Sequence, residues 1–167
     1  MEITIRRIGN DELHLVQEIA AKTWPSTFAE ILSESQIDYM LKMMYSTEVL
    51  SRQLSNGHQF LIAFEGNTPL GFAGIELNFP IQKTVKIHKL YVLPQTQGKG
   101  IGVLLLNEMK KIAIEDQCNQ LLLNVNRFNK ATNFYSKYGF EIVKEEDIDI
   151  GNGYFMNDYV MEMKIKS

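Results

Sequence analysis

Three glycines at alternate positions, Gly98, Gly100 and Gly102 in the stretch QTQGKGIG (95–102), constrain this chain more than any other feature. The stretch follows an apolar segment typical of a strand and precedes a leucine-rich segment typical of a helix. Glycine permits positive φ and close approach of a ligand to the backbone. The free N–H groups and the dipole at a helix N-terminus attract anions. The stretch therefore predicts a strand–turn–helix unit that binds phosphate.

Three phosphate-binding patterns compete for this stretch. The Walker pattern G-x-x-x-x-G-K-[ST] is not met, and the Rossmann fingerprint fails because Val103 stands at its third glycine position. The pattern [QR]-x-x-G-x-[GA] is met by 97–102 and, in a second register, by 95–100. Because only three of its six positions are fixed, this pattern is weak alone, and a helix N-terminus with incidental glycines stays open.

The remaining chain predicts a single domain over 1–167 with a mixed α/β (α+β) sheet, in the order β-ααα-βββ-α-β-α-ββ. The first helix, 12–24, is expected to have Asn10 or Asp11 as its cap and to be interrupted at Pro25. The further helices are predicted at 33–45, 46–56, 100–117 and 129–139. The strands are predicted at 2–8, 58–65, 69–77, 84–93, 120–126, 140–146 and 154–166.

Composition narrows the class of protein. Apolar residues make up 45% and the net charge is −3, which fits a globular protein and argues against a nucleic-acid binder. The N-terminus lacks a secretory apolar core, and no apolar run approaches the ~18–20 residues of a membrane span. One cysteine, Cys118, fits a reducing compartment, so we expect a cytoplasmic protein. His14, His58 and His88 are isolated along the chain, so no metal site is expected.

Two blocks together resemble the GNAT (Gcn5-related) N-acetyltransferase superfamily. KLYVLPQTQGKGIGVLLLNEM is similar to the central strand, pyrophosphate loop and following helix of that family. LLLNVNRFNKATNFYSKYGFEIV is similar to its next strand and helix, with the pattern N-x-x-A-x-x-F-Y-x-x-x-G-F. Neither Asn126 nor Asn129 stands at the usual spacing for the first position of that pattern; the other positions are filled by Ala131, Phe134, Tyr135, Gly139 and Phe140.

The resemblance implies acetyl-CoA as the co-substrate and no metal. Its pantetheine arm would enter a splayed gap between strands 86–93 and 121–126, and Asn129 would approach it from the other side. The backbone of Leu90, Tyr91 and Val92 would pair with the pantetheine and the acetyl carbonyl. The pyrophosphate would rest on the backbone N–H groups of Gln97, Gly98, Lys99, Gly100, Ile101 and Gly102.

The resemblance also implies catalytic roles. Tyr135 stands where relatives place the tyrosine that protonates the departing thiolate, although a packing role on the helix is the alternative. Many relatives carry a glutamate base near the position of Lys86, from which this chain departs. His88 and Glu76 are therefore candidate bases, with a water relay as the third option.

The acceptor is less constrained. TWPSTFAE and STEVLSRQLSN resemble the bacterial polyamine (spermidine/spermine) acetyltransferase branch, and Trp24, Phe28, Tyr154 and Asp158 are expected to border the acceptor pocket. The acidic run 145–149 either attracts a polycation or is a solvated loop.

We expect acetyl transfer to the primary amine of a small molecule by direct attack in a ternary complex. The alternatives are a protein or peptide N-acetyltransferase and a non-catalytic acyl-CoA sensor. Relatives are often homodimers, so a homodimer is one expectation.

Overall fold

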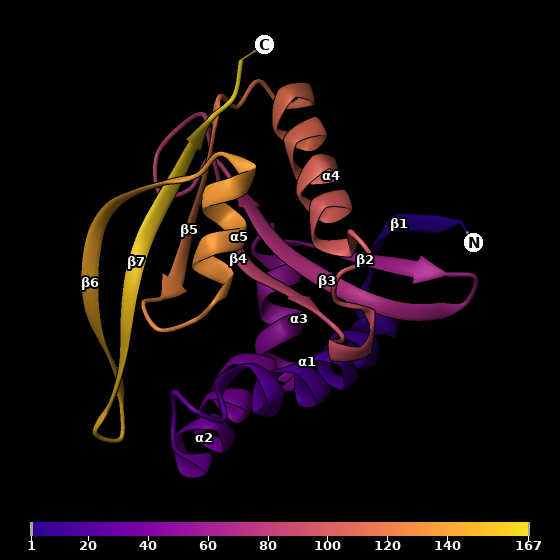
Figure 1. Cartoon of the computed structure of the whole chain (residues 1–167). Coiled ribbons are helices and arrows are strands. Elements are labelled where there is room, and N and C mark those ends of the chain that lie inside the picture. The colour runs from indigo at the N-terminus through magenta and orange to yellow at the C-terminus, as the bar shows by residue number, and fades with distance from the viewer. Residues whose placement is uncertain (1, 167) are drawn as a thin grey trace.

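One seven-stranded sheet, with the strand order β1-β2-β3-β4-β5-β7-β6, organises the chain (Figure 1). The computed structural model describes residues 2–166, so the two end residues of the expected domain lie outside it. The strands are β1 (Ile3–Ile8), β2 (Gln59–Glu65), β3 (Thr68–Leu77), β4 (Thr84–Val92), β5 (Gln120–Asn126), β6 (Glu141–Gly151) and β7 (Tyr154–Lys164). The helices are α1 (Leu13–Phe28), α2 (Glu34–Tyr45), α3 (Thr47–Ser55), α4 (Ile101–Glu115) and α5 (Ala131–Tyr138). The predicted order of elements is confirmed.

The helices cover the two faces of the sheet separately (Figure 1). On one face, α1, α2 and α3 pack on a core that includes Trp24, Phe60 and Phe72. On the other face, α4 and α5 pack on a core that includes Leu105 and Met109. Because apolar side chains alternate between the two faces along β2 and β3, both faces are buried.

Two of the predicted boundaries are wrong. Residues 10–12 form a short 3₁₀ turn and α1 begins at Leu13 without a side-chain cap, so neither Asn10 nor Asp11 caps it. The helix also continues through Pro25 to Phe28, because the buried aromatic rings on either side of the proline hold the chain in the core. Ser33 and Ser46, in contrast, cap α2 and α3 through their side chains.

The acidic run 145–149 lies in a strand and not in a loop. β6 continues to Gly151 and pairs with β7 along this stretch, so the hairpin is longer than the sequence suggested. The run of acidic residues suggested a solvated loop because β6 is an edge strand whose side chains are mostly exposed. The hairpin reaches α2, where the Tyr39 hydroxyl donates to the carbonyl oxygen of Ile150 at 2.7 Å.

The parallel strands β4 and β5 separate halfway along their length. Their pairing ends at Ile87 and Leu123, although β4 continues to Val92 and β5 to Asn126. A bulge lies at the same level, since Gly74 of β3 faces Lys89 and the next residue, Ile75, faces Ile87. His88 is therefore an extra residue in β4, and the strand turns away from β5 beyond it. This is the splayed gap that the sequence predicted.

Candidate functional site

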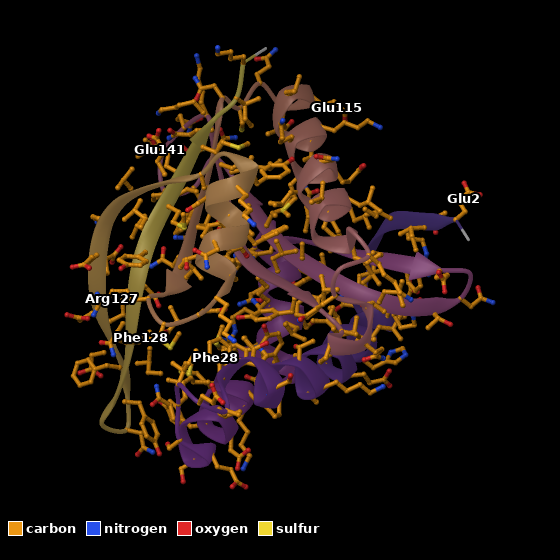
Figure 2. The ribbon with its side chains drawn as sticks, viewed as in Figure 1. Glu2, Phe28, Glu115, Arg127, Phe128 and Glu141 are labelled. Atoms are coloured by element: carbon orange, nitrogen blue, oxygen red, sulfur yellow. The ribbon has the colours of Figure 1, made fainter. Side chains whose placement is uncertain are left out.

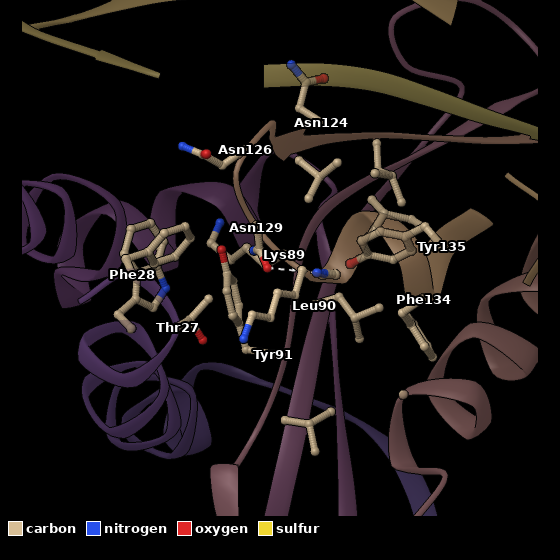
Figure 3. A pocket seen from close by; sticks show the side chains of 18 of the residues that line it. Thr27, Phe28, Lys89, Leu90, Tyr91, Asn124, Asn126, Asn129, Phe134 and Tyr135 are labelled. Atoms are coloured by element: carbon tan, nitrogen blue, oxygen red, sulfur yellow. Dashed lines mark hydrogen bonds between the residues drawn. The ribbon is translucent and has the colours of Figure 1, made fainter. Parts of the chain in front are cut away.

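A cavity of about 1200 Å³ occupies the gap between β4 and β5. It exceeds the roughly 300–1,000 Å³ of an ordinary small-molecule pocket. Leu90 and Tyr135 reach it from the α4–α5 side, while Tyr91 reaches it from the other side (Figure 3). Trp24, in the core beneath α1–α3, also lines it, as does Asp158, whose neighbour Tyr159 on β7 packs on the α4–α5 side. The cavity therefore passes through the sheet and has room for a long ligand that enters from one face and a second molecule on the other.

The glycine turn forms one end of this cavity. Gly98 and Gly100 have φ of 88° and 80°, and a Cβ on either would meet nothing within 4 Å, so both need glycine for backbone conformation. Gly102 needs it for another reason: its Cβ would lie 2.9 Å from Cζ of Phe134 on α5. Two glycines thus shape the turn and the third lets α4 and α5 pack together.

The turn presents uncommitted N–H groups to the cavity. No side chain caps α4, so the N–H groups of its first turn, from Ile101 to Val103, have no partner within the helix. Within residues 2–166 the N–H groups of Gly98 and Gly100 also lack a backbone acceptor. Positive-φ glycines beside a bare helix N-terminus are what a diphosphate requires. The residues present therefore fit the diphosphate of acetyl-CoA, whose thioester would supply the acetyl group here.

Asn129 and Lys130 lie across the cavity from the turn. The Asn129 side-chain oxygen accepts from the N–H of Ala131 at 2.9 Å, which starts α5 and leaves its amide nitrogen free to donate. Lys99, by contrast, is exposed and does not line the cavity. The N–H groups of Gln97 and Lys99 donate within the turn, to the carbonyl oxygens of Pro94 and Thr96 at 3.3 Å, so, contrary to expectation, neither is free for the pyrophosphate. Phe128 and Arg127 lie beside the β6–β7 hairpin (Figure 2).

Tyr135 is almost fully buried, and its hydroxyl points toward the middle of the cavity (Figure 3). Burial raises the pKa of Tyr135 well above its ordinary value, so the phenol keeps its proton at neutral pH. Its ring packs between Phe134 and Phe140, with centroids 5.4 and 5.6 Å away. The phenol is rigidly placed beside the gap and carries a proton that it can donate, although its raised pKa makes it a weaker acid than a free tyrosine.

Asp158 lies on the opposite side of the sheet. It is 5% exposed and lines the cavity; its Oδ2 accepts from Nδ2 of Asn124 at 3.3 Å, and its Oδ1 is buried without a hydrogen-bond partner among the described residues. Burial raises the pKa of Asp158 above its ordinary value. A buried carboxylate oxygen with no partner is costly unless a ligand supplies a donor.

The other predicted site residues divide into two groups. Trp24, Phe28 and His88 line the cavity, as do the predicted backbone segments of β4 and the turn. Glu76 and Tyr154 do not: Glu76 contacts two histidines, and the Tyr154 ring packs on Tyr39 with centroids 5.3 Å apart. Burial lowers the pKa of His88 to about 4, so this imidazole is a weak proton acceptor.

Sequence reasoning missed several residues that line the cavity. Lys89 turns inward because of the bulge beside His88, and burial lowers the pKa of its amine to about 8. Glu146 of β6 also lines the cavity. The acceptor side also has an apolar wall formed by Met40, Met43, Met44, Ile148, Ile150 and Met156. Their spacing along the chain carries no signal, since two separate elements, α2 and the β6–β7 hairpin, supply them.

The splayed strand pair and the glycine turn at a bare helix N-terminus are the features expected of an acyltransferase that uses an acyl-CoA. A family model described as an acetyltransferase (GNAT) domain matches residues 28–163. A spermidine N(1)-acetyltransferase of Thermoplasma acidophilum is 33% identical to this chain over the full length of both. The chain therefore belongs to the GNAT acetyltransferase family.

Solved structures agree with this assignment. A PaiA N-acetyltransferase from Thermoplasma acidophilum in complex with coenzyme A superposes with a TM-score of 0.83 at 33% identity, over 98% of this chain and 99% of that one. A GCN5-related N-acetyltransferase from Rhodopseudomonas palustris, 21% identical, gives 0.84 over 99% and 97% and supports the fold alone. Within residues 2–166, no helix is both long and apolar enough to cross a membrane.

Proposed function

We propose that this enzyme transfers the acetyl group of acetyl-CoA to a primary amine of a small polycation of the polyamine type. The observation that carries the proposal is the buried, unpartnered Oδ1 of Asp158 on the acceptor side of the cavity. Glu146 provides a second carboxylate in the same cavity. The methionine-rich wall would cover the methylene segments between the charged nitrogens of such a molecule.

The similarity to a spermidine acetyltransferase over the whole chain supports the same substrate class. A polyamine nitrogen is mostly protonated at neutral pH, so it must lose a proton before it attacks. Of the bases expected from the sequence, His88 is a weak acceptor and Glu76 lies outside the cavity. We therefore place the proton acceptor at Asp158, whose raised pKa makes it a better base than an exposed aspartate.

In the proposed reaction the amine nitrogen forms a bond to the thioester carbonyl carbon. The carbon–sulfur bond then breaks, Asp158 holds the proton that the amine loses, and the Tyr135 hydroxyl gives its proton to the departing thiolate. Unpaired backbone groups of Leu90 and Val92 in the gap would orient the acetyl carbonyl.

An acceptor panel tests this proposal. Release of CoA thiol would be followed with spermidine, spermine, mono-amines, amino acids, aminoglycosides and peptides. We expect the highest kcat/KM with polyamines. A preference for peptides would instead assign the enzyme to protein acetylation, and CoA binding without turnover of any amine would assign it to sensing.

A further inference from the structure

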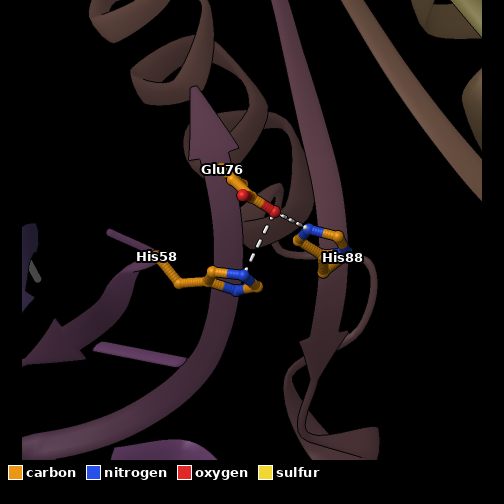
Figure 4. Close-up of side chains that lie close together, drawn as sticks. All are labelled: His58, Glu76 and His88. Atoms are coloured by element: carbon orange, nitrogen blue, oxygen red, sulfur yellow. Dashed lines mark hydrogen bonds and ion pairs between the residues drawn. The ribbon is translucent and has the colours of Figure 1, made fainter. Parts of the chain in front are cut away.

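His58, Glu76 and His88 form a compact cluster outside the machinery proposed above (Figure 4). One carboxylate oxygen, Oε1 of Glu76, lies 3.0 Å from Nε2 of His88 and 3.1 Å from Nε2 of His58. The two imidazole rings are stacked with centroids 4.7 Å apart and an angle of 10° between their planes. One nitrogen of each imidazole and one carboxylate oxygen therefore lie close together.

The sheet places these side chains before any ligand binds. Gln59 of β2 pairs with Ile75 of β3, so His58, which directly precedes β2, stands opposite Glu76. His88 joins them because it is the extra residue of the β4 bulge, between Lys89 and Ile87. The three positions thus come from the residue before β2, the last part of β3 and the bulge of β4.

Lys86, which lies opposite Glu76 on β4, does not form an ion pair with the Glu76 carboxylate. Lys86 is the cross-strand partner of Glu76, yet its amine donates to Oδ1 of Asn124 at 2.6 Å on the other side. Within residues 2–166, the ion pairs of the Glu76 carboxylate are those with the two histidines. With side chains 13–23% exposed, the cluster is sheltered but open to exchange with solvent.

Two imidazole nitrogens and one carboxylate oxygen are a common ligand set for Zn²⁺. The three ligand atoms lie within 4.8 Å of one another. Tetrahedral Zn²⁺ with bonds of about 2.0–2.1 Å needs neighbouring ligand atoms about 3.4 Å apart. The two stacked imidazole rings would have to rotate so that both Nε2 lone pairs point at the ion. We propose that His58, Glu76 and His88 bind one Zn²⁺ ion, with the fourth position left to water.

The site would adjoin the acetyl-transfer cavity without being part of the coenzyme site. His88 lines the cavity, whereas His58 and Glu76 do not. The competing interpretation is a metal-free cluster in which both imidazoles donate Nε2–H to Glu76. Measuring metal binding distinguishes these two interpretations, because a cluster held only by hydrogen bonds would not bind Zn²⁺ specifically.

Zn²⁺ titration by calorimetry tests the proposal, on tag-free full-length protein with Cys118→Ser to remove the single thiol. Co²⁺ then replaces Zn²⁺ so that its visible absorption reports the coordination geometry. The site variants are His58→Ala and Glu76→Gln, the second nearly isosteric. His14→Ala is the matched control, since His14 is the third histidine and is exposed on α1.

We expect one equivalent of Zn²⁺ in the parent and in His14→Ala, and affinity lowered at least about tenfold in both site variants. Zn²⁺ should also raise the Tm of the parent but not that of Glu76→Gln. Absence of binding to the parent, or equal binding by the folded Glu76→Gln protein, would overturn the proposal. None of these measurements depends on acetyl transfer, so they stand apart from the test of the proposed substrate.

Discussion

Single side chains on the two sides of the gap carry the proposed chemistry, and their protonation follows from burial. Tyr135 keeps its proton because it is surrounded by aromatic rings, and Asp158 binds a proton more readily than usual because it is shielded from water. The same physical cause therefore keeps the phenol protonated on one face of the sheet and makes the carboxylate a stronger base on the other.

Replacing Tyr135 with phenylalanine removes the proposed proton donor and keeps the ring. We expect kcat to fall by about 10²–10⁴-fold, the usual contribution of a general acid, with little change in the Kd for CoA. Tyr138→Phe is the control, because Tyr138 lies on the same helix and its hydroxyl donates to Asn107. Wild-type turnover by Tyr135→Phe would show that Tyr135 only packs; stopped-flow thiol release measures both variants.

Asp158→Asn should separate activity from stability. We expect kcat/KM for the amine to fall at least about tenfold, because the ammonium loses its carboxylate. The pKa of Asp158 is higher in the folded protein than its ordinary value of 3.8 in the unfolded chain. Ionisation of Asp158 therefore lowers the free energy of unfolding as the pH rises from 3.8 through the raised pKa. The variant should therefore have a higher Tm than wild type at pH 7, and this difference should vanish below pH 3.8. Thermal scans from pH 3 to 8 test the sign.

At the scale of elements, the sequence predicted the strands, the helices and the glycine turn because each has a local pattern. Ser33 and Ser46 are ordinary caps, and the glycine stretch is an ordinary helix entry. The sequence could not predict that α1 continues through Pro25 or that His58 meets His88. These features depend on packing and on the β4 bulge, which join residues far apart in the chain.

The turn itself can be tested with glycine substitutions. Gly100→Ala places a side chain at φ of 80°, which costs about 1–2 kcal/mol of stability. Gly57→Ala has a similar cost at φ of 96°, also in open space and outside the cavity lining, so it is the matched control. We expect only Gly100→Ala to raise the Kd for CoA, by at least about tenfold. Equal affinities in calorimetry would place the pyrophosphate elsewhere.

At the scale of the whole molecule, the acceptor side is assembled from parts distant in sequence. The Tyr39 hydroxyl joins α2 to the β6–β7 hairpin through the carbonyl of Ile150, and Gln36 donates to the carbonyl of Phe155 at 2.9 Å. These contacts hold the methionine-rich wall in place. The sequence did not reveal them, because neither element signals its partner.

Tyr39→Phe should therefore act on the acceptor and not on the coenzyme. Loss of one hydrogen bond of about 0.5–1.5 kcal/mol should raise the KM for the amine by about 2–10-fold. The Kd for CoA should stay the same, because the glycine turn lies on α4. Steady-state kinetics together with calorimetry distinguish this result from a general loss of structure, which would change both constants.

The separation of β4 from β5 creates two open edges in the interior of a sheet, where soluble proteins normally leave no peptide group without a partner. A bound pantetheine arm, with its two amides, is chemically a short piece of peptide. The coenzyme would thus take the place of a strand between β4 and β5, so that its binding would also satisfy the unpaired peptide groups of the sheet.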